Sequence, residues 1–190
     1  MDLRSLHEHV DAPPRPTFAV RPFMLAAAVL IVTASRLLPH PHNVTPVAAV
    51  SLFAGACFTD RRVAFLLPIS AMVLSDAFIG FSALSPVVYA CLLMQVAVGF
   101  RLRRRRDASS IAAGTLFGSC LFFLATNAVF WLRAYPGTLA GLAECYASAA
   151  PFFGRSLLGD AAYSALLFGA LALVEARFPA MRERPQAVPV

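Results

Sequence analysis

The chain of 190 residues contains no lysine, and all 16 of its basic residues are arginines. Without an ammonium side chain there is no phosphate-loop lysine, no Schiff base and no amine nucleophile, so we exclude ATP hydrolysis by this chain. Charged residues are scarce as well, at 14%, whereas 59% of the residues are hydrophobic and the mean hydropathy is +0.70. This composition predicts a membrane protein without a separate soluble domain.

The residue patterns of common membrane-embedded enzymes are also absent. All four histidines lie in the N-terminal leader or in a turn at 40–42, so no helix presents a histidine to a serine on another helix. The only near match to the HExxH zinc motif, HEH at 7–9, has the wrong spacing. Asp76 and Asp160 are candidate paired carboxylates, but their surroundings carry no protease signature. We therefore predict that the protein is not an enzyme and carries no cofactor.

Six apolar runs predict an all-α bundle of six transmembrane helices, because about 20 helical residues cross a bilayer core of about 30 Å. The second run is short, so we expect it to be tilted or partly buried. A further stretch, 138–153, mixes apolar and polar residues at helical spacing, which favours an additional interfacial helix that forms a lid between helices 5 and 6. The six runs are 23–38, 44–58, 63–81, 84–100, 111–132 and 157–174.

The predicted organisation is a flexible cytoplasmic N-terminal tail at 1–22, a six-helix transmembrane domain at 23–175 and a cytoplasmic C-terminal tail at 176–190. Arginine sets the orientation, because positive residues near helix ends stay on the cytoplasmic side. With both termini inside, 13 arginines are cytoplasmic and only Arg36, Arg133 and Arg155 are outside. A cleavable signal peptide ending near 33–35 is a weaker alternative, since the leader is long and more helices follow.

Five of the arginines form a basic run at 101–106. In the predicted topology this run belongs to a cytoplasmic connection between two spans. Anionic lipid at the membrane surface explains such a run without any nucleic acid. We therefore predict the lipid bilayer as a partner and expect no nucleic acid.

Polar side chains collect near the outer ends of the predicted helices. An ionisable group at membrane depth costs about 2.5 to 3.5 kcal/mol, so such positions indicate function. We predict a polar cavity that opens to the outside and binds a small-molecule substrate. Some of its side chains would donate hydrogen bonds to the substrate, and carboxylates and amides would orient it. Trp131 and Tyr146 would offer aromatic faces for stacking. The candidate substrate-binding residues are Arg36, His40, His42, Asn43, Asp76, Asn127, Trp131, Glu144, Tyr146 and Asp160.

Structural roles are the alternative for the same residues. Asp76 and Asp160 would then neutralise Arg36 or Arg155 in ion pairs that hold helices together. Asn127 alone would bridge two helices by a hydrogen bond. The clustering of these groups on one side favours the functional interpretation.

A metal site is a weaker alternative. His40 and His42 flank a proline, and Asp76 or Cys145 would complete a site for a transition metal or a corrinoid. No CxxC pair occurs among the four cysteines, three of which lie in apolar runs and are expected to act as small hydrophobes. Cys145 is predicted to lie outside, either buried in the lid or open to a ligand.

Small residues recur at four-residue spacing in two of the runs. Gly114 and Gly118 form one stripe, and Ala161, Ala165 and Gly169 form the other. Such stripes allow another helix to approach closely. We expect both to pack inside this bundle rather than against a partner protein.

Seven strings, in order along the chain, resemble a family of small bacterial membrane proteins of unknown function that are described as transport proteins. The resemblance covers about residues 25–175. That family is in turn similar to the S components of energy-coupling-factor (ECF) transporters, six-helix proteins that bind vitamins or metal ions from the outside. The strings are RLLPHPHNVTP from 36, LSDAFIG from 74, ATN from 125, YPGTLAGL from 135, ECY from 144, PFF from 151 and LGD from 158.

The resemblance implies an S-component-like uptake protein of the bacterial inner membrane that captures a small polar, vitamin-like solute. An ECF coupling module, made of a transmembrane T component and ATPases, would be its partner. S components present an Ala-xxx-Ala stripe on helix 1 to that module, whereas Ala26, Ala27 and Ala28 have no alanine four residues later. A solitary uptake protein is therefore an alternative, as are uptake of a metal or metal cofactor and a non-transporting membrane scaffold or assembly subunit.

Overall fold

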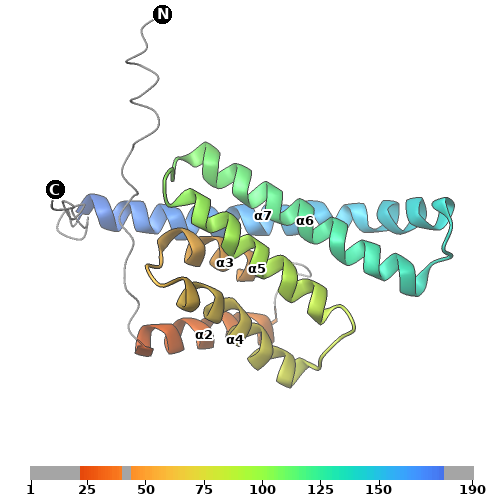
Figure 1. The fold of residues 1–190 in the computed structure, drawn as a ribbon, viewed down its shortest axis with the longest axis horizontal. Helices are drawn as coiled ribbons and strands as arrows, with labels where there is room; N and C mark the ends of the chain where they lie inside the picture. The colour runs from red at the N-terminus through yellow and green to blue at the C-terminus, as the bar shows by residue number, and fades with distance from the viewer. Residues whose placement is uncertain (1–21, 40–43, 178–190) are drawn as a thin grey trace, which may run out of the picture.

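The computed structural model describes residues 22–39 and 44–177, which form six helices and no β-strand. Successive helices run in opposite directions (Figure 1). The prediction of an all-α bundle is confirmed, and the predicted tails lie almost wholly outside the described residues. The helices are α2 (Pro22–Leu37), α3 (Val47–Cys57), α4 (Arg61–Ile79), α5 (Ser85–Leu102), α6 (Ala108–Ala134) and α7 (Leu139–Arg177).

Four of these helices, α4 to α7, are long and apolar enough to cross a membrane. The other two are shorter apolar helices, with 16 residues in α2 and 11 in α3. Eight of the 11 residues of α3 are buried, so its neighbours enclose it on most sides. The prediction that the short second run is partly buried is therefore confirmed. A helix of that length reaches only about 17 Å.

The prediction of a separate lid helix before the last span is wrong. The interfacial helix expected at 138–153 and the span expected at 157–174 form one continuous helix, α7, with Pro151 inside it. A proline has no N–H group, so the carbonyl oxygen of Ala147, four residues earlier, loses its helix donor. Ala147 and Pro151 are both exposed, so the helix continues without a buried acceptor left unsatisfied. At 39 residues α7 is about 58 Å long. Its hairpin with α6 extends past the connection between α4 and α5 (Figure 1).

The core of the bundle forms around α3. Leu52 of α3, Leu67 of α4 and Val96 of α5 are almost completely buried, and Phe53 meets Phe168 of α7 edge to face at 5.2 Å between ring centroids. These contacts join α3 to three neighbouring helices, so the shortest helix is the centre of the packing.

One arginine of the basic run turns inward and caps α3. The Nε–H group of Arg103 donates to the carbonyl oxygen of Gly55 at 2.9 Å, and its Nη2 donates to that of Phe58. Its guanidinium also lies 4.7 Å from the centroid of the Phe100 ring. The last carbonyl groups of a helix have no partner within the helix, so Arg103 satisfies groups that α3 leaves open. Burial lowers the pKa of Arg103 from its ordinary value.

The basic run therefore has two kinds of member. Arg106 also contacts the protein, with its Nη1 atom 3.5 Å from the sulfur of Cys57 and 4.0 Å from the carboxylate of Glu175. Arg101, Arg104 and Arg105 are exposed. The expectation that the run faces lipid thus stays a prediction for these three residues, whereas Arg103 and Arg106 hold helices together.

Replacing Arg103 with alanine should lower the free energy of unfolding by about 1–2 kcal/mol, because two carbonyl groups at the end of α3 lose their donor. Thermal unfolding of the purified protein in detergent measures this change. Arg104→Ala is the matched control, since Arg104 belongs to the same run and is exposed. Equal destabilisation by the two substitutions would show that Arg103 does not act as a cap.

Candidate functional site

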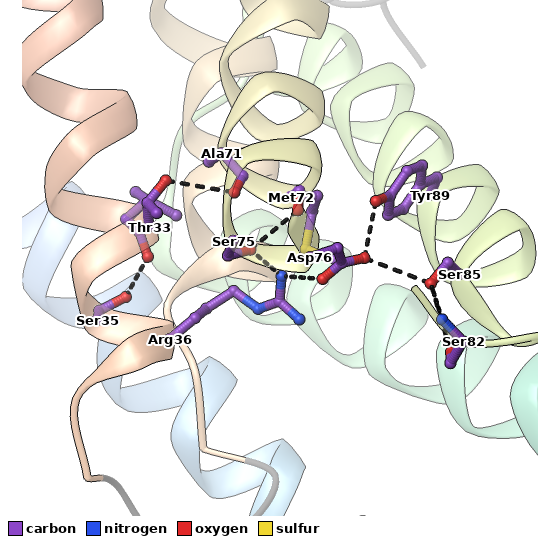
Figure 2. Close-up of polar contacts among 11 residues, drawn as sticks. Thr33, Ser35, Arg36, Ala71, Met72, Ser75, Asp76, Ser82, Ser85 and Tyr89 are labelled. Atoms are coloured by element: carbon purple, nitrogen blue, oxygen red, sulfur yellow. Dashed lines mark hydrogen bonds and ion pairs between the residues drawn. The ribbon is translucent and has the colours of Figure 1, made fainter. Parts of the chain in front are cut away.

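An ion pair between Arg36 and Asp76 joins α2 to α4. The Nη1 atom of Arg36 lies 2.7 Å from Oδ1 of Asp76 and also donates to the hydroxyl of Ser75 (Figure 2). Both charged residues lie in the last turn of their helices. The side chain of Asp76 is only 5% exposed and that of Arg36 is 19% exposed. The predicted ion pair between these two residues is confirmed.

Asp76 is also hydrogen-bonded to α5. Its Oδ2 atom accepts from the hydroxyl of Tyr89 at 2.7 Å and from that of Ser85 at 3.3 Å (Figure 2). The local sequence brings α5 back to this point, because α4 ends at Gly80 with a φ of 104°, a left-handed value that favours glycine. Both oxygens of Asp76 therefore have donors from the protein, and Asp76 fixes the position of Arg36 rather than presenting an open acceptor.

A cavity of about 430 Å³ lies next to this ion pair. All six helices contribute to its wall, and most of the lining is apolar. Among the described residues of the wall, Arg36 is basic and Asp160 is acidic, and they lie 124 positions apart in the sequence. The structure thus brings these two predicted site residues together.

Asp160 lies on α7 and is 8% exposed. Its Oδ2 atom accepts a hydrogen bond from the hydroxyl of Ser119 on α6 at 2.7 Å. Within the described residues no cation pairs with Asp160, and Oδ1 has no donor. The predicted alternative of an ion pair between Asp160 and Arg155 is not found there, since Arg155 is exposed on the outside of α7.

A second cavity, of about 440 Å³, adjoins the first. The two share Val88, Phe122 and Ser156 in their walls, so we call them the joined cavities. Ser119, the donor to Asp160, lines the second cavity. The lid segment that the sequence predicts contributes to this wall as part of α7. Five of the lining residues are phenylalanines: Phe122, Phe123, Phe130, Phe152 and Phe153.

Asn127 is the other predicted site residue in these walls. It lines the second cavity, and its Nδ2 atom donates to the carbonyl oxygen of Phe123 at 2.8 Å, one turn earlier in α6. The side-chain bond therefore stays within one helix, and the alternative of a bridge to another helix is not seen in the described residues. The backbone carbonyl of Asn127 accepts from the thiol of Cys145 at 3.6 Å.

Besides Asp76, three predicted residues line neither of the joined cavities. The Nε1–H group of Trp131 donates to the carbonyl of Pro136 at 2.9 Å, and the hydroxyl of Tyr146 donates to that of Leu124 at 2.7 Å. Glu144 is exposed. Trp131 and Tyr146 thus stabilise the hairpin of α6 and α7 and do not offer stacking faces to these cavities.

The metal alternative receives no support within 22–39 and 44–177. These residues contain no group of three histidine, cysteine or acidic side chains that could hold a metal ion. Cys145 is 1% exposed and donates to a backbone carbonyl, so it is buried in the hairpin rather than open to a ligand. The predicted candidates His40, His42 and Asn43 lie outside the described residues.

The sequence alone did not single out the hydroxyl groups of the site. Ser75, Ser85, Ser119 and Tyr89 all bind a charged residue, yet serine is common wherever helices pack closely. Tyr89 carried the clearest signal, because a hydroxyl group within an apolar run requires a partner. Its position one turn after Ser85 places both hydroxyls on the same face of α5.

Comparison with known proteins bears on the whole described region. Residues 16–181 match the sequence profile of a family described only as a family of unknown function, DUF6580. No curated protein and no solved structure matches the chain. The match spans every helix and both cavities, so the site described above belongs to the part of the chain that the family shares.

Proposed function

We propose that this chain, which belongs to the family of unknown function DUF6580, is a membrane protein that binds a small polar solute. The solute would bind in the joined cavities and would be taken up across the bacterial inner membrane. The observation that carries this proposal is the convergence of Arg36 and Asp160 on one cavity walled by all six helices. Each cavity has the volume of a small-molecule site, for which about 300–1,000 Å³ is typical.

The distribution of charge supports an outward-facing site. Among the described arginines, eight lie at the end of the bundle where α4 and α6 begin and α5 and α7 end, and three lie at the opposite end or in the hairpin. Positive residues are retained on the cytoplasmic side, so the arginine-rich end would face the cell interior with both termini. Arg36 and Asp76, in the last turns of α2 and α4, would then lie near the outer surface.

In this proposal the two short helices complete a six-helix, S-component-like bundle. Packing around α3 compensates for its length, because its polar backbone and its apolar side chains are enclosed by protein. Ala26 and Ala27 of α2 are exposed, and no alanine follows four residues later in either register. The protein would therefore act either with an ECF coupling module that recognises another surface or as a solitary uptake protein.

A non-transporting scaffold is the second candidate function, and the saturated hydrogen bonding of Asp76 favours it. A scaffold would need the ion pair between Arg36 and Asp76 but would have no use for an open cavity. Filling the cavity without disturbing the ion pair therefore separates the two functions.

Ser156→Phe places a large side chain at the wall that the joined cavities share. We expect it to abolish uptake of the solute while Ala150→Phe, at an exposed position on the same helix outside both cavities, leaves uptake unchanged. The measurement is removal of vitamins, amino acids and nucleosides from a defined medium, followed by mass spectrometry and normalised to folded protein in the membrane. Cells without the gene give the baseline.

Two outcomes would contradict the proposal. Either cells with the wild-type protein remove every solute at the baseline rate, or Ser156→Phe removes solute as fast as the wild type. In the second case the protein transports, but not through the joined cavities.

A further inference from the structure

Among the described residues, the ionisable groups that line the joined cavities do not balance in charge. Arg36 is already neutralised by Asp76, whose carboxylate lies 2.7 Å from its Nη1 atom. Asp160 also lines the wall, and no described cation pairs with it. A carboxylate removed from water is stable only with a proton or with a cation beside it. Among the described residues of the cavity wall, the group whose charge has no partner is therefore the carboxylate of Asp160.

Asp160 lies where the two cavities meet. It lines the first cavity, and its hydrogen-bond donor Ser119 lines the second. The hydroxyl of Ser119 occupies Oδ2, while Oδ1 has no donor among the described residues. A donor group on a ligand at the junction would complete the hydrogen bonding of this carboxylate and would neutralise its charge.

The second cavity determines the rest of the ligand. Its polar groups are few, and its five phenylalanines include Phe123 and Phe153, whose ring centroids are 4.8 Å apart. Aromatic walls bind flat or apolar groups through their area, and the faces of the rings attract cations. An anionic ligand would gain little from these walls. It would meet Asp160 unfavourably and would reach Arg36 only in competition with Asp76.

We propose that the solute is a small organic cation, in which a protonated amine pairs with Asp160 and an aromatic or apolar body fills the phenylalanine-lined cavity. This inference rests on the proposed solute-binding function and names the class of its substrate. Arg36, whose charge Asp76 neutralises, then adds no net charge to the wall of the first cavity. Ser119 acts as a positioning residue, because its hydroxyl orients the carboxylate that receives the amine.

Three probes with the same body and different heads test this class: 2-phenylethylamine, 2-phenylethanol and 3-phenylpropionate. Binding to the purified full-length protein in detergent is measured by calorimetry. We expect the amine to bind at least about tenfold more tightly than the alcohol and the propionate, as one charge-assisted hydrogen bond would give. Ser156→Phe should remove this binding, because it fills the junction.

Asp160→Asn is the decisive variant, since asparagine retains an acceptor for Ser119 but carries no charge. It should bind the amine no more tightly than the alcohol. Asp60→Asn is the matched control: Asp60 is exposed at the start of α4, asparagine caps a helix as well as aspartate does, and the preference for the amine should persist. The wild-type ranking tests the inference by itself if the Asp160 variant does not fold.

The inference is overturned if the amine binds no more tightly than the alcohol, if no probe binds, or if Asp160→Asn keeps the preference. None of these outcomes decides the proposed function. The uptake comparison with Ser156→Phe does so independently, because it uses natural solutes of every charge.

Discussion

Replacing Asp76 with alanine is expected to lower the free energy of unfolding by about 3–5 kcal/mol, because the largely buried guanidinium of Arg36 then has no counter-ion. The hydroxyl of Tyr89 loses its acceptor in the same substitution. Unfolding in a mixture of mild detergent and dodecyl sulfate, followed by circular dichroism, measures the loss. Glu144→Ala removes an exposed acid from the hairpin and should change stability by less than about 0.5 kcal/mol.

A double-mutant cycle identifies the origin of the loss. Arg36→Met combined with Asp76→Ala removes both charges, so the double variant should be more stable than the sum of the single effects implies. Purely additive losses would mean that the ion pair contributes little and that the destabilisation comes from the cavity left by the missing side chain.

The ion pair also explains how a cation is held in the wall of a cavity. Arg36 lies in the last turn of α2. Asp76 and Ser75 fix its Nη1 atom, and Tyr89 and Ser85 fix Asp76 in turn. Three helices therefore hold one guanidinium in the cavity wall. If the proposed function holds, solute binding should weaken together with stability when this network is broken.

Sequence reasoning located the polar residues by height along the helices but not by direction around them. Counting residues from the helix ends gives height at about 1.5 Å per residue, which is why Arg36 and Asp160 were expected on one side and do share a cavity. The direction of a side chain depends on how each helix is rotated against its neighbours. Trp131 and Tyr146 have the expected place along the chain, yet both bind backbone carbonyls of the hairpin.

Apolar runs predicted where helices occur better than where they end. The run for α3 and the runs for α4 to α6 match the observed helices within a few residues. The sequence predicted separate helices at 138–153 and 157–174, whereas one helix, α7, continues through both. Composition likewise could not show that Arg103 turns inward, because the open carbonyls that it binds belong to a helix far away in sequence.

The small-residue stripes also show that the sequence does not give the direction in which a residue faces around its helix. A Cβ atom on Gly114 would lie 3.3 Å from Leu52, and one on Gly118 would overlap the side-chain amide of Gln95, so this stripe packs inside the bundle as predicted. For the second stripe the prediction was wrong at Gly169, where a Cβ atom would meet nothing within 4 Å. It lines an open groove between α6 and α7. Spacing alone does not distinguish a packed stripe from an open one.

A close contact between α3 and α5 involves two glycines, Gly55 and Gly99, that no stripe indicated, and it gives the second large expected effect. Gly99→Leu should lower the free energy of unfolding by more than about 3 kcal/mol, beyond ordinary overpacking of a core. A Cβ atom on Gly99 would overlap the carbonyl oxygen of Leu52 and lie 2.9 Å from the Cα atom of Gly55. These neighbours are backbone atoms of the buried helix α3, so neither α3 nor α5 moves aside without opening the core.

Gly169→Leu is the matched control for that substitution, since it adds the same side chain to a helical glycine with open space around it. Thermal unfolding of both variants in detergent, with the yield of folded protein from membranes, measures the difference. A Gly99 variant as stable as the Gly169 variant would mean that α3 and α5 lie farther apart than described. In that case the neighbouring helices would not enclose α3. A helix of only 11 residues that is not enclosed could not complete a six-helix bundle around the joined cavities.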